Sequence, residues 1–377
     1  MRVCHITSCH GEKDTRIFYK ECVSLAKKDY EVFLVSPGKK NEVCKGVHII
    51  AAGERPNNRI KRMFSFAKQV IKKSLNLRAD VYHIHDPELL IFVKQLKKTG
   101  AKIVFDSHEN VVKDIATKPY LPKVIAIFFS KVYHIYINLI SRHIDGVIGV
   151  TPNHYNDLKI YNSPIEIITN YPIISYNYVE HEKTDEVKLC FTGGISDTWC
   201  MKNVIEAVQN SSSNIKLLLC GPVDQKYFET VIKPNLSEKI EYLGKLSYDE
   251  AMQVQKQSDI GVAIARYSPA LDDDIGTLGN TKIFEYMIAG LPVVCTDFIL
   301  WKKIIDETKC GFYVSPNDVK RISNLFDKLA NSYRLRKEFG RNARIASEQK
   351  YNWETQEEIL YRFYETILEN KSISEIK

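Results

Sequence analysis

The sequence lacks several features that would place it in a special class of protein. No apolar run reaches the roughly 18 residues of a membrane-spanning helix, and the chain opens directly on an expected strand. Its nine cysteines include no Cys-x-x-Cys pair, which favours reduced, mostly buried thiols. It shows no nucleic-acid-binding motif, no low-complexity tract and no internal repeat. These absences predict a cytoplasmic globular protein that does not bind nucleic acid.

Length and charge add two expectations. At 377 residues, with 44% hydrophobic and 26% charged residues, the chain is long enough for two domains with separate cores. Residues 1–180 hold 27 Lys and Arg against 17 Asp and Glu, whereas residues 181–377 hold 26 against 29. The basic first half is therefore expected to meet an anionic partner.

Short apolar strands alternate with amphipathic helices, which predicts parallel sheets covered by helices. The alternation pauses at the polar stretch 180–186 and then restarts. We therefore predict two doubly wound α/β domains, over residues 1–178 and 187–355, followed by a helical tail over 356–377. The expected strands are residues 2–7, 31–36, 81–84, 102–106 and 146–150, then 187–192, 216–220, 240–243, 260–263 and 293–295. Helices are expected over 17–28 and 353–368.

In doubly wound sheets, ligands bind outside the carboxyl ends of the strands. Gly193 and Gly194 directly follow an expected strand, and glycines allow a backbone to approach a phosphate closely. The alternative is an ordinary turn at the end of a strand. The two glycines are thus candidates for contact with a phosphate.

The stretch 279–294 indicates a loop, a helix and a buried strand. Asn280 and Thr281 are good cap residues, and Gly290 with Pro292 would end the helix. A helix N-terminus attracts anions, so Lys282 beside it would add a cation for a diphosphate. The alternative for Lys282 is a solvent-exposed structural lysine. Glu285, one turn further, could accept two sugar hydroxyls.

The pattern Lys282-x-x-Glu285-Tyr-Met-x-x-Gly-x-Pro292-Val-Val resembles the signature of glycosyltransferase family 4, whose members have the GT-B fold. Asp14-x-Arg16-Ile-Phe-x-Lys-Glu resembles a segment of one branch of these enzymes. The resemblance runs from Arg16 to Trp353. It implies two Rossmann-like domains that face a cleft, with the tail helix crossing back to the first domain. It further implies transfer of a hexose or N-acetylhexosamine with retention, without a metal ion or cofactor.

The resemblance also assigns site residues. His108, which follows the strand 102–106, and Lys282 would act in catalysis, while Asp14 and Arg16 would bind the acceptor. A packed-loop histidine is the alternative for His108, and a salt bridge to Asp14 or Glu21 is the alternative for Arg16. The expected donor-binding residues are Gly193, Gly194, Lys245, Leu246, Asn280, Thr281 and Glu285.

Three positions depart from the family pattern. Ile195 falls near an expected Arg, Trp199-Cys200 aligns with Lys-Gly, and Thr277 stands where the first of two paired glutamates is expected. The acidic run 272–274 lies near Thr277 and could be a solvated loop. These departures leave a second interpretation open, in which the chain is a GT-B protein that binds nucleotide sugars or assists assembly but does not transfer a sugar. A sugar-nucleotide epimerase is a third candidate function.

His83-x-His85-Asp86-Pro-Glu88 places two histidines on the same side of a strand, next to an acid. Such a group could bind a metal, but the sequence identifies no third ligand. We therefore expect structural hydrogen bonds at the end of the strand and no metal site.

Two segments bear on membranes. From Arg59 to Arg78, seven Lys and Arg and no acid alternate with apolar residues at near-helical spacing, which favours contact with an anionic membrane. For residues 122–144, also basic and apolar, packing in the core is expected. The predicted partners are thus a nucleotide-sugar donor, a glycan or lipid-linked saccharide acceptor and the inner face of the plasma membrane. This setting suits the assembly of capsule or other surface polysaccharide.

Overall fold

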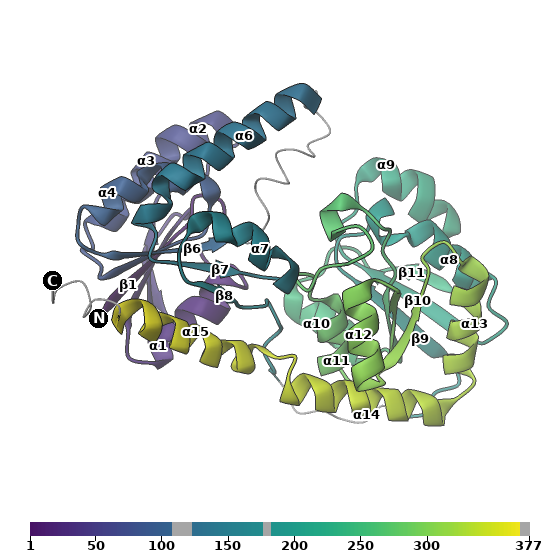
Figure 1. Ribbon diagram of the computed structural model, residues 1–377. Coiled ribbons are helices and arrows are strands. Elements are labelled where there is room, and N and C mark those ends of the chain that lie inside the picture. Colours follow the sequence, from purple (N-terminus) through teal and green to yellow (C-terminus); the bar gives the residue numbers. More distant parts are fainter. Residues whose placement is uncertain (108–122, 176–181, 370–377) are drawn as a thin grey trace. The chain divides into compact units, whose positions relative to one another are not determined.

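The computed structural model describes residues 1–107, 123–175 and 182–369 (Figure 1). The chain forms two compact units, one made of Met1–Asn170 with Trp353–Lys377 and the other of Tyr171–Asn352. Each unit is built on one parallel or almost wholly parallel sheet with helices on both faces. The predicted α/β class with two Rossmann-like units is confirmed.

The first unit contains an eight-stranded sheet in the order β3-β4-β2-β1-β5-β6-β7-β8. All neighbours pair in parallel except β3, which is antiparallel to β4. The central strands are buried on both faces, which explains their continuous apolar sequences. The strands are β1 (Arg2–Ile6), β2 (Glu31–Ser36), β3 (Glu42–Cys44), β4 (Val47–Ala51), β5 (Val81–Ile84), β6 (Lys102–Ser107), β7 (Gly146–Gly149) and β8 (Ile165–Ile167).

Helices α2, α3, α4 and α6 lie on one face of this sheet, and α1 and α15 lie on the other (Figure 1). The α-helices are α1 (Val23–Lys27), α2 (Arg59–Lys61), α3 (Ala67–Leu75), α4 (Val93–Lys97), α6 (Lys123–Ile140), α7 (Tyr155–Leu158) and α15 (Trp353–Glu369). Short 3₁₀- and π-helical segments complete the unit: η1 (Ile17–Cys22), η2 (Arg62–Phe66), η3 (Pro87–Phe92), η4 (Ser141–His143), η5 (Pro152–His154) and η6 (Lys159–Tyr161).

The C-terminal helix α15 belongs to the first unit, although the second unit precedes it in the chain. Trp353 Nε1 donates a hydrogen bond to Ser24 Oγ at 2.8 Å, and the Tyr361 hydroxyl donates to the carbonyl of Ser24 at 2.8 Å. The Tyr364 hydroxyl lies 2.8 Å from His83 Nδ1. These buried contacts hold α15 against α1 and β5.

The second unit contains a six-stranded parallel sheet in the order β11-β10-β9-β12-β13-β14. Its strands are β9 (Val187–Thr192), β10 (Ile215–Cys220), β11 (Ile240–Tyr242), β12 (Ile260–Ala263), β13 (Val293–Thr296) and β14 (Gly311–Val314). Its helices are α8 (Met201–Gln209), α9 (Gln225–Tyr227), α10 (Tyr248–Lys256), α11 (Lys282–Ile288), α12 (Ile299–Thr308), α13 (Val319–Ala330) and α14 (Tyr333–Gln349). Short turns are η7 (Asp197–Trp199), η8 (Phe228–Ile232), η9 (Lys233–Asn235) and η10 (Pro269–Leu271).

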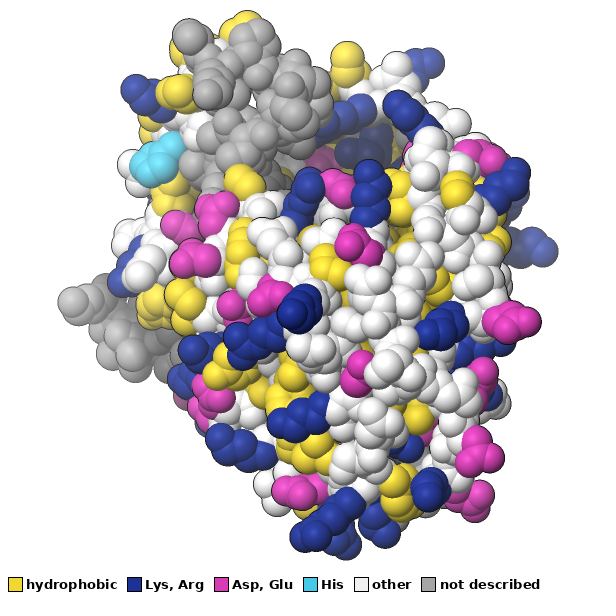
Figure 2. Space-filling model, turned by 90° about the vertical axis from the view of Figure 1, so that its right-hand side faces the viewer, with side chains coloured by type: hydrophobic (Ala, Val, Ile, Leu, Met, Phe, Trp, Pro, Cys, Tyr) yellow, Lys and Arg dark blue, Asp and Glu magenta, His cyan; other side chains and the backbone are white. Residues whose placement is uncertain are grey.

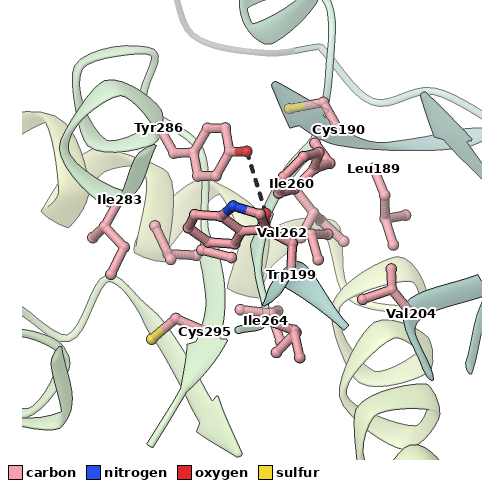
Figure 3. Packing of buried hydrophobic residues seen from close by; sticks show 14 of the residues in the cluster. Leu189, Cys190, Trp199, Val204, Ile260, Val262, Ile264, Ile283, Tyr286 and Cys295 are labelled. Atoms are coloured by element: carbon pink, nitrogen blue, oxygen red, sulfur yellow. Dashed lines mark hydrogen bonds between the residues drawn. The ribbon is translucent and has the colours of Figure 1, made fainter. Parts of the chain in front are cut away.

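The core of the second unit packs α8 and α11 against the sheet (Figure 3). Trp199, Ile283 and Tyr286 are buried among strand residues such as Leu189 and Val262. The face of the molecule drawn in Figure 2 carries basic and acidic side chains interspersed, without a large area of one sign.

The prediction that residues 122–144 pack in the core is wrong for most of the described side chains. On α6, only Ile137 and Ile140 are buried among the described positions. Its exposed apolar side chains are Ile125, Ile127, Phe128, Val132, Ile135 and Leu139. The helical spacing of apolar residues cannot tell a face that meets the core from one that meets solvent. Within the described residues, no helix combines the length and the apolar character that crossing a membrane requires.

Candidate functional site

In the second unit, three glycines follow neighbouring strands at their carboxyl ends. Gly193, Gly221 and Gly244 follow β9, β10 and β11 and have φ values of 136°, 144° and 81°, which suit only glycine well. The Gly193 N–H donates to Cys220 O, and the Gly221 N–H donates to Gly244 O, both at 2.8 Å. A Cβ on Gly221 would strike the carbonyl of Gly193. This glycine edge therefore offers closely packed backbone without side chains, and the adjoining Gly194 is exposed.

Lys282 opens α11 and folds its side chain against the glycine edge. A Cβ on Gly193 would strike Lys282 Nζ. The ammonium lies 4.5 Å from the ring centre of Trp199 and 5.3 Å from that of Phe191, within cation–π range. Burial lowers the pKa of Lys282, and the charge of Glu285 opposes this shift. Among the residues that the structure describes, no carboxylate forms an ion pair with this ammonium.

Glu285 lies one turn beyond Lys282 and is held in place by two neighbours. The Thr281 hydroxyl donates to Glu285 Oε1 at 2.6 Å, and Gln255 Nε2 lies 3.4 Å from Oε2. Gln255 also donates to Thr192 Oγ1 at 2.7 Å, which ties the carboxylate to the end of β9. The Thr281 hydroxyl thus bonds to Glu285 and does not cap the helix. Asn280 Oδ1 instead accepts a hydrogen bond from the Lys282 N–H at 3.2 Å.

Tyr286, which the sequence analysis did not single out, anchors α11 to the sheet. Its hydroxyl accepts from the Thr192 N–H and donates to Val262 O, each at 3.2 Å (Figure 3). Its ring lies so close to Gly261 that a Cβ there would collide with it. Tyr286 and Gln255 therefore fix the position of Lys282 and Glu285 relative to the strand ends. Position 286 lies inside the motif, but Gln255 carries no sequence signal.

Two of the three unusual positions are core residues. Ile195 is 3% exposed and Trp199 is 7% exposed, so both side chains pack in the core and neither brings a charge to the site. Cys200 has a φ of 44°, a left-handed conformation that suits the glycine expected there. The turn therefore has the backbone conformation of a glycine at Cys200, while Ile195 and Trp199 contribute apolar packing.

Thr277, the third unusual position, shapes a turn. Its hydroxyl accepts from the Gly279 N–H at 3.0 Å, and its carbonyl accepts from Trp301 Nε1 at 2.9 Å. In the nearby acidic run, Asp273 and Asp274 are exposed. Lys245 is exposed and Leu246 is half-buried, both directly after the glycine edge. Their contact with a donor stays a prediction.

A further cation stands beside the turn that contains Trp199. Arg266 follows β12, and its Nη2 lies 2.6 Å from Asp197 Oδ2 in a half-exposed ion pair. Its backbone N–H donates to Thr198 O at 2.9 Å. Arg266 is therefore a second candidate for charge near the glycine edge.

In the first unit, Arg16 is buried and paired. Its guanidinium donates to Asp106 at 2.9 and 3.1 Å and to Ile168 O at 3.0 Å, and Nε lies 3.0 Å from Glu21 Oε1. The structure thus contains the salt bridge to Glu21 that the sequence left open. Asp14 Oδ1 accepts from the N–H groups of Arg16 and Ile17 at 2.9 Å and so begins η1. Acceptor binding by Asp14 and Arg16 stays a prediction.

His10 is a partly exposed titratable group that the sequence analysis did not select. Its Nδ1 lies 3.2 Å from Asp14 Oδ2, and its Nε2 lies 3.7 Å from Asp86 Oδ1. The hydrogen bond to Asp14 raises the pKa of His10 against the effect of burial. Asp86 accepts from the Thr7 hydroxyl at 2.8 Å and the Cys9 N–H at 3.1 Å, and so orders the loop after β1. His108 lies outside the described residues.

The two histidines of the 83–88 segment are fully buried. His83 contacts the hydroxyl of Tyr364 at 2.8 Å, and His85 Nε2 lies 2.9 Å from His5 Nδ1. The expected structural hydrogen bonds are therefore present.

Comparisons with known proteins match both halves of the chain. The family model described as glycosyl transferases group 1 matches residues 177–346, and the model described as glycosyltransferase family 4 matches residues 15–171. An uncharacterized glycosyltransferase of Methanocaldococcus jannaschii is 21% identical over 223 residues, which are 58% of this chain and 55% of that protein. The chain thus matches about half the length of this curated relative.

Solved structures share the fold over nearly the whole chain. Sucrose-phosphate synthase from Thermosynechococcus elongatus has a TM-score of 0.74 at 14% identity and covers 98% of this chain and 100% of its own. Anabaena HepE in complex with UDP and glucose has a TM-score of 0.68 at 11% identity, and the match covers 97% of this chain and 100% of that protein's chain. At such identities the likeness concerns the fold alone.

Proposed function

The chain belongs to glycosyltransferase family 4, and we propose that it transfers a sugar from a nucleotide-sugar donor to a saccharide acceptor. The observation that carries this proposal is the ammonium of Lys282, held against the glycine edge without an ion-pair partner among the described residues. A half-buried cation without an anion is less favourable than a paired one, so the site is suited to the diphosphate of a donor. Anabaena HepE, which shares the fold, has been solved with UDP and glucose, which supports this donor class.

The roles within the site follow from its contacts. Lys282 and the backbone of Gly193 and Gly194 would stabilise the negative charge of the leaving diphosphate. Glu285, fixed by Thr281 and Gln255, would accept hydrogen bonds from the hydroxyls of the nucleotide ribose. Arg266 would supply charge on the other side of the Trp199 turn.

We propose that the sugar is a hexose or N-acetylhexosamine and that its anomeric configuration is retained. The bond between the sugar carbon and the diphosphate breaks, and a glycosidic bond forms to the acceptor oxygen on the same face. The acceptor proton passes to an oxygen of the leaving diphosphate, so no separate protein base is required. Catalysis then rests on positioning and charge stabilisation, without a metal ion in the transfer step.

The direct test is release of UDP from a panel of UDP-sugars, with and without lipid-linked saccharide acceptors. Wild-type protein should release UDP, and Glu285→Ala should bind UDP more weakly because the ribose loses its acceptor. Glu307→Ala is a matched control, since Glu307 is an exposed glutamate of the same unit that pairs with Lys350. Unchanged UDP affinity in Glu285→Ala would refute the site assignment.

A second candidate function is nucleotide-sugar binding without transfer. The burial of Ile195 and Trp199 favours it, because these apolar side chains stand where family members place cations. UDP-sugar binding without UDP release, even with acceptors supplied, would establish this function and overturn transfer.

We also propose that the first unit binds the anionic inner face of the plasma membrane, where a lipid-linked acceptor for surface polysaccharide would lie. Helix α6 and the segment 59–78 cover the same face of the sheet (Figure 1). The segment buries Phe66, Ala67, Val70 and Ile71 in the core but exposes Ile60 and Phe64 at 69% and 60%. Its exposed cations are Arg59, Lys61, Lys68, Lys72 and Arg78.

Sedimentation with liposomes tests the membrane proposal. Cations near an anionic surface contribute about 1 kcal/mol each, so Lys68→Glu combined with Lys72→Glu should reduce binding to phosphatidylglycerol vesicles at least tenfold. Ile135→Ser with Leu139→Ser should do the same, because both side chains are exposed on α6. Lys302→Glu with Lys303→Glu, on the second unit, is the charge-matched control. Equal binding to neutral and anionic vesicles would refute the proposal.

A further inference from the structure

The first unit contains a cluster of four fully buried side chains that combine nitrogen and oxygen ligands. His5 lies on β1, Glu21 on η1, His83 on β5 and His85 directly after β5. The parallel register pairs His5 with His83, and the side chain of His85 points to the same side as that of His83. One potential ligand atom from each of the four residues lies within 4.8 Å of all the others. The fold thus assembles a third and a fourth ligand that the sequence did not reveal.

Around Glu21, the distances in the cluster fit an ion better than direct hydrogen bonds. Glu21 Oε2 lies 4.0 Å from His5 Nδ1 and 3.9 Å from Nε2 of both His83 and His85. His5 Nδ1 and His85 Nε2 share a hydrogen bond at 2.9 Å, which a metal ion bound by both nitrogens would replace. A tetrahedral zinc site with bonds of about 2.0–2.2 Å separates its ligand atoms by roughly 3.3–3.6 Å. The three distances from Glu21 would each have to shorten by about half an ångström, and the distance between His5 Nδ1 and His85 Nε2 would have to lengthen by a similar amount, to reach that geometry.

Hydrogen bonding leaves part of the cluster unsatisfied. His83 Nε2 and both oxygens of Glu21 are buried and accept or donate no hydrogen bond. Arg16 Nε lies 3.0 Å from Glu21 Oε1, but its N–H is directed to Asp106. Buried polar groups without partners are costly and uncommon, and an ion bound by Glu21 Oε2 and His83 Nε2 would satisfy two of these atoms.

The outer nitrogen of His83 has a hydrogen-bond partner of the kind that metal-bound histidines usually have, and the outer nitrogen of His85 lies near a carboxylate. His83 Nδ1 lies 2.8 Å from the hydroxyl of Tyr364, and His85 Nδ1 lies 3.4 Å from Asp106 Oδ2. Asp106 is in turn held by Arg16 at 2.9 and 3.1 Å. Such outer contacts orient imidazole rings toward a metal and fix which nitrogen binds it.

We infer that His5 Nδ1, Glu21 Oε2, His83 Nε2 and His85 Nε2 bind one Zn²⁺ ion. Three nitrogens and one oxygen in a tetrahedral set are ligands that zinc accepts. All four side chains are inaccessible to solvent, so the ion has a structural role and does not meet substrate. It joins β1, β5 and η1, and through Tyr364 it ties them to α15.

The metal content of the full-length protein tests this inference. The protein is purified through a tag without histidine, in buffers without chelator, and analysed by inductively coupled plasma mass spectrometry. We expect about one zinc per chain, and X-ray absorption at the zinc edge should show three nitrogen ligands and one oxygen ligand. Absence of zinc in protein purified with added zinc chloride would overturn the inference, as would a different metal at the same stoichiometry.

Variants identify the ligands. Glu21→Gln and His83→Asn should lose most of the zinc, while His134→Asn, an exposed histidine of α6, should keep it. Because a ligand variant can fail to fold, wild-type protein stripped of metal under denaturing conditions and refolded provides an independent measurement. Its melting temperature should rise on addition of zinc and not of magnesium. An equal response to both ions, or none, would overturn the inference.

Discussion

Replacing Lys282 by Met would remove a half-buried positive charge while keeping the length of the side chain and most of its apolar contacts. The ammonium lies 4.5 Å from the ring centre of Trp199 and 5.3 Å from that of Phe191, and no carboxylate of the described residues pairs with it. We therefore expect this one change to act differently on folding and on donor binding.

The effect on stability is the balance of two contributions. Relieving the burial of an ammonium without an anionic partner stabilises the fold by about 1–3 kcal/mol. Loss of the two cation–π contacts offsets about 0.5–2 kcal/mol of that gain. The free energy of unfolding of Lys282→Met should therefore stay level or rise by up to about 2 kcal/mol.

The effect on binding is larger and has the opposite sign. A charge-assisted contact with a diphosphate in a partly buried site is worth about 2–4 kcal/mol. Its loss should raise the Kd for UDP by about 30-fold to 1,000-fold.

Urea unfolding and isothermal titration calorimetry with UDP measure the two effects. Lys302→Met is the matched control, because Lys302 also lies over an aromatic ring, 5.1 Å from Tyr313, but is exposed on α12. It should change neither quantity. If Lys282→Met bound UDP within threefold of wild type, or unfolded at least 2 kcal/mol more easily, Lys282 would be a structural lysine and the reasoning would fail.

Three further predictions concern the backbone and the pH response. Gly193→Ala should abolish UDP binding in calorimetry and lower the free energy of unfolding by about 1–3 kcal/mol, because the new Cβ strikes the lysine ammonium at a φ of 136°. Gly194→Ala, whose Cβ meets nothing within 4 Å, should leave the free energy of unfolding unchanged in urea unfolding. Cys200→Gly should raise the free energy of unfolding by about 0.5–1 kcal/mol by relieving a left-handed φ of 44°, and a decrease in urea unfolding would contradict this. The pKa of His10 is raised by its hydrogen bond to Asp14, so its stabilising contribution is complete below about pH 6 and is lost as the pH rises through the folded pKa. Urea unfolding from about pH 5 to 9 should show this loss in wild type and not in His10→Gln, and equal pH profiles would refute it.

The strands that the sequence predicted best are those buried on both faces. The expected ranges 31–36, 81–84, 187–192 and 260–263 agree with β2, β5, β9 and β12 to the residue. A continuous apolar run between polar boundaries defines such a strand locally. The strands β3, β4, β8 and β14 were missed; β3 pairs only at the sheet edge and exposes 67% of Val43, so its pattern is weak.

The sequence by itself determined the α/β class, the restart near residue 187 and the helix that presents Lys282 and Glu285. Each depends on residues near one another in the chain, whose spacing fixes a helix face or a strand. Only the tertiary structure decided which groups meet: Arg16 pairs with Asp106, 90 residues away, and Tyr364 reaches His83 from the C-terminal helix. It also decided that α6 exposes its apolar face and that His5 and Glu21 join His83 and His85. Such contacts depend on strand order and helix placement, which local spacing does not encode.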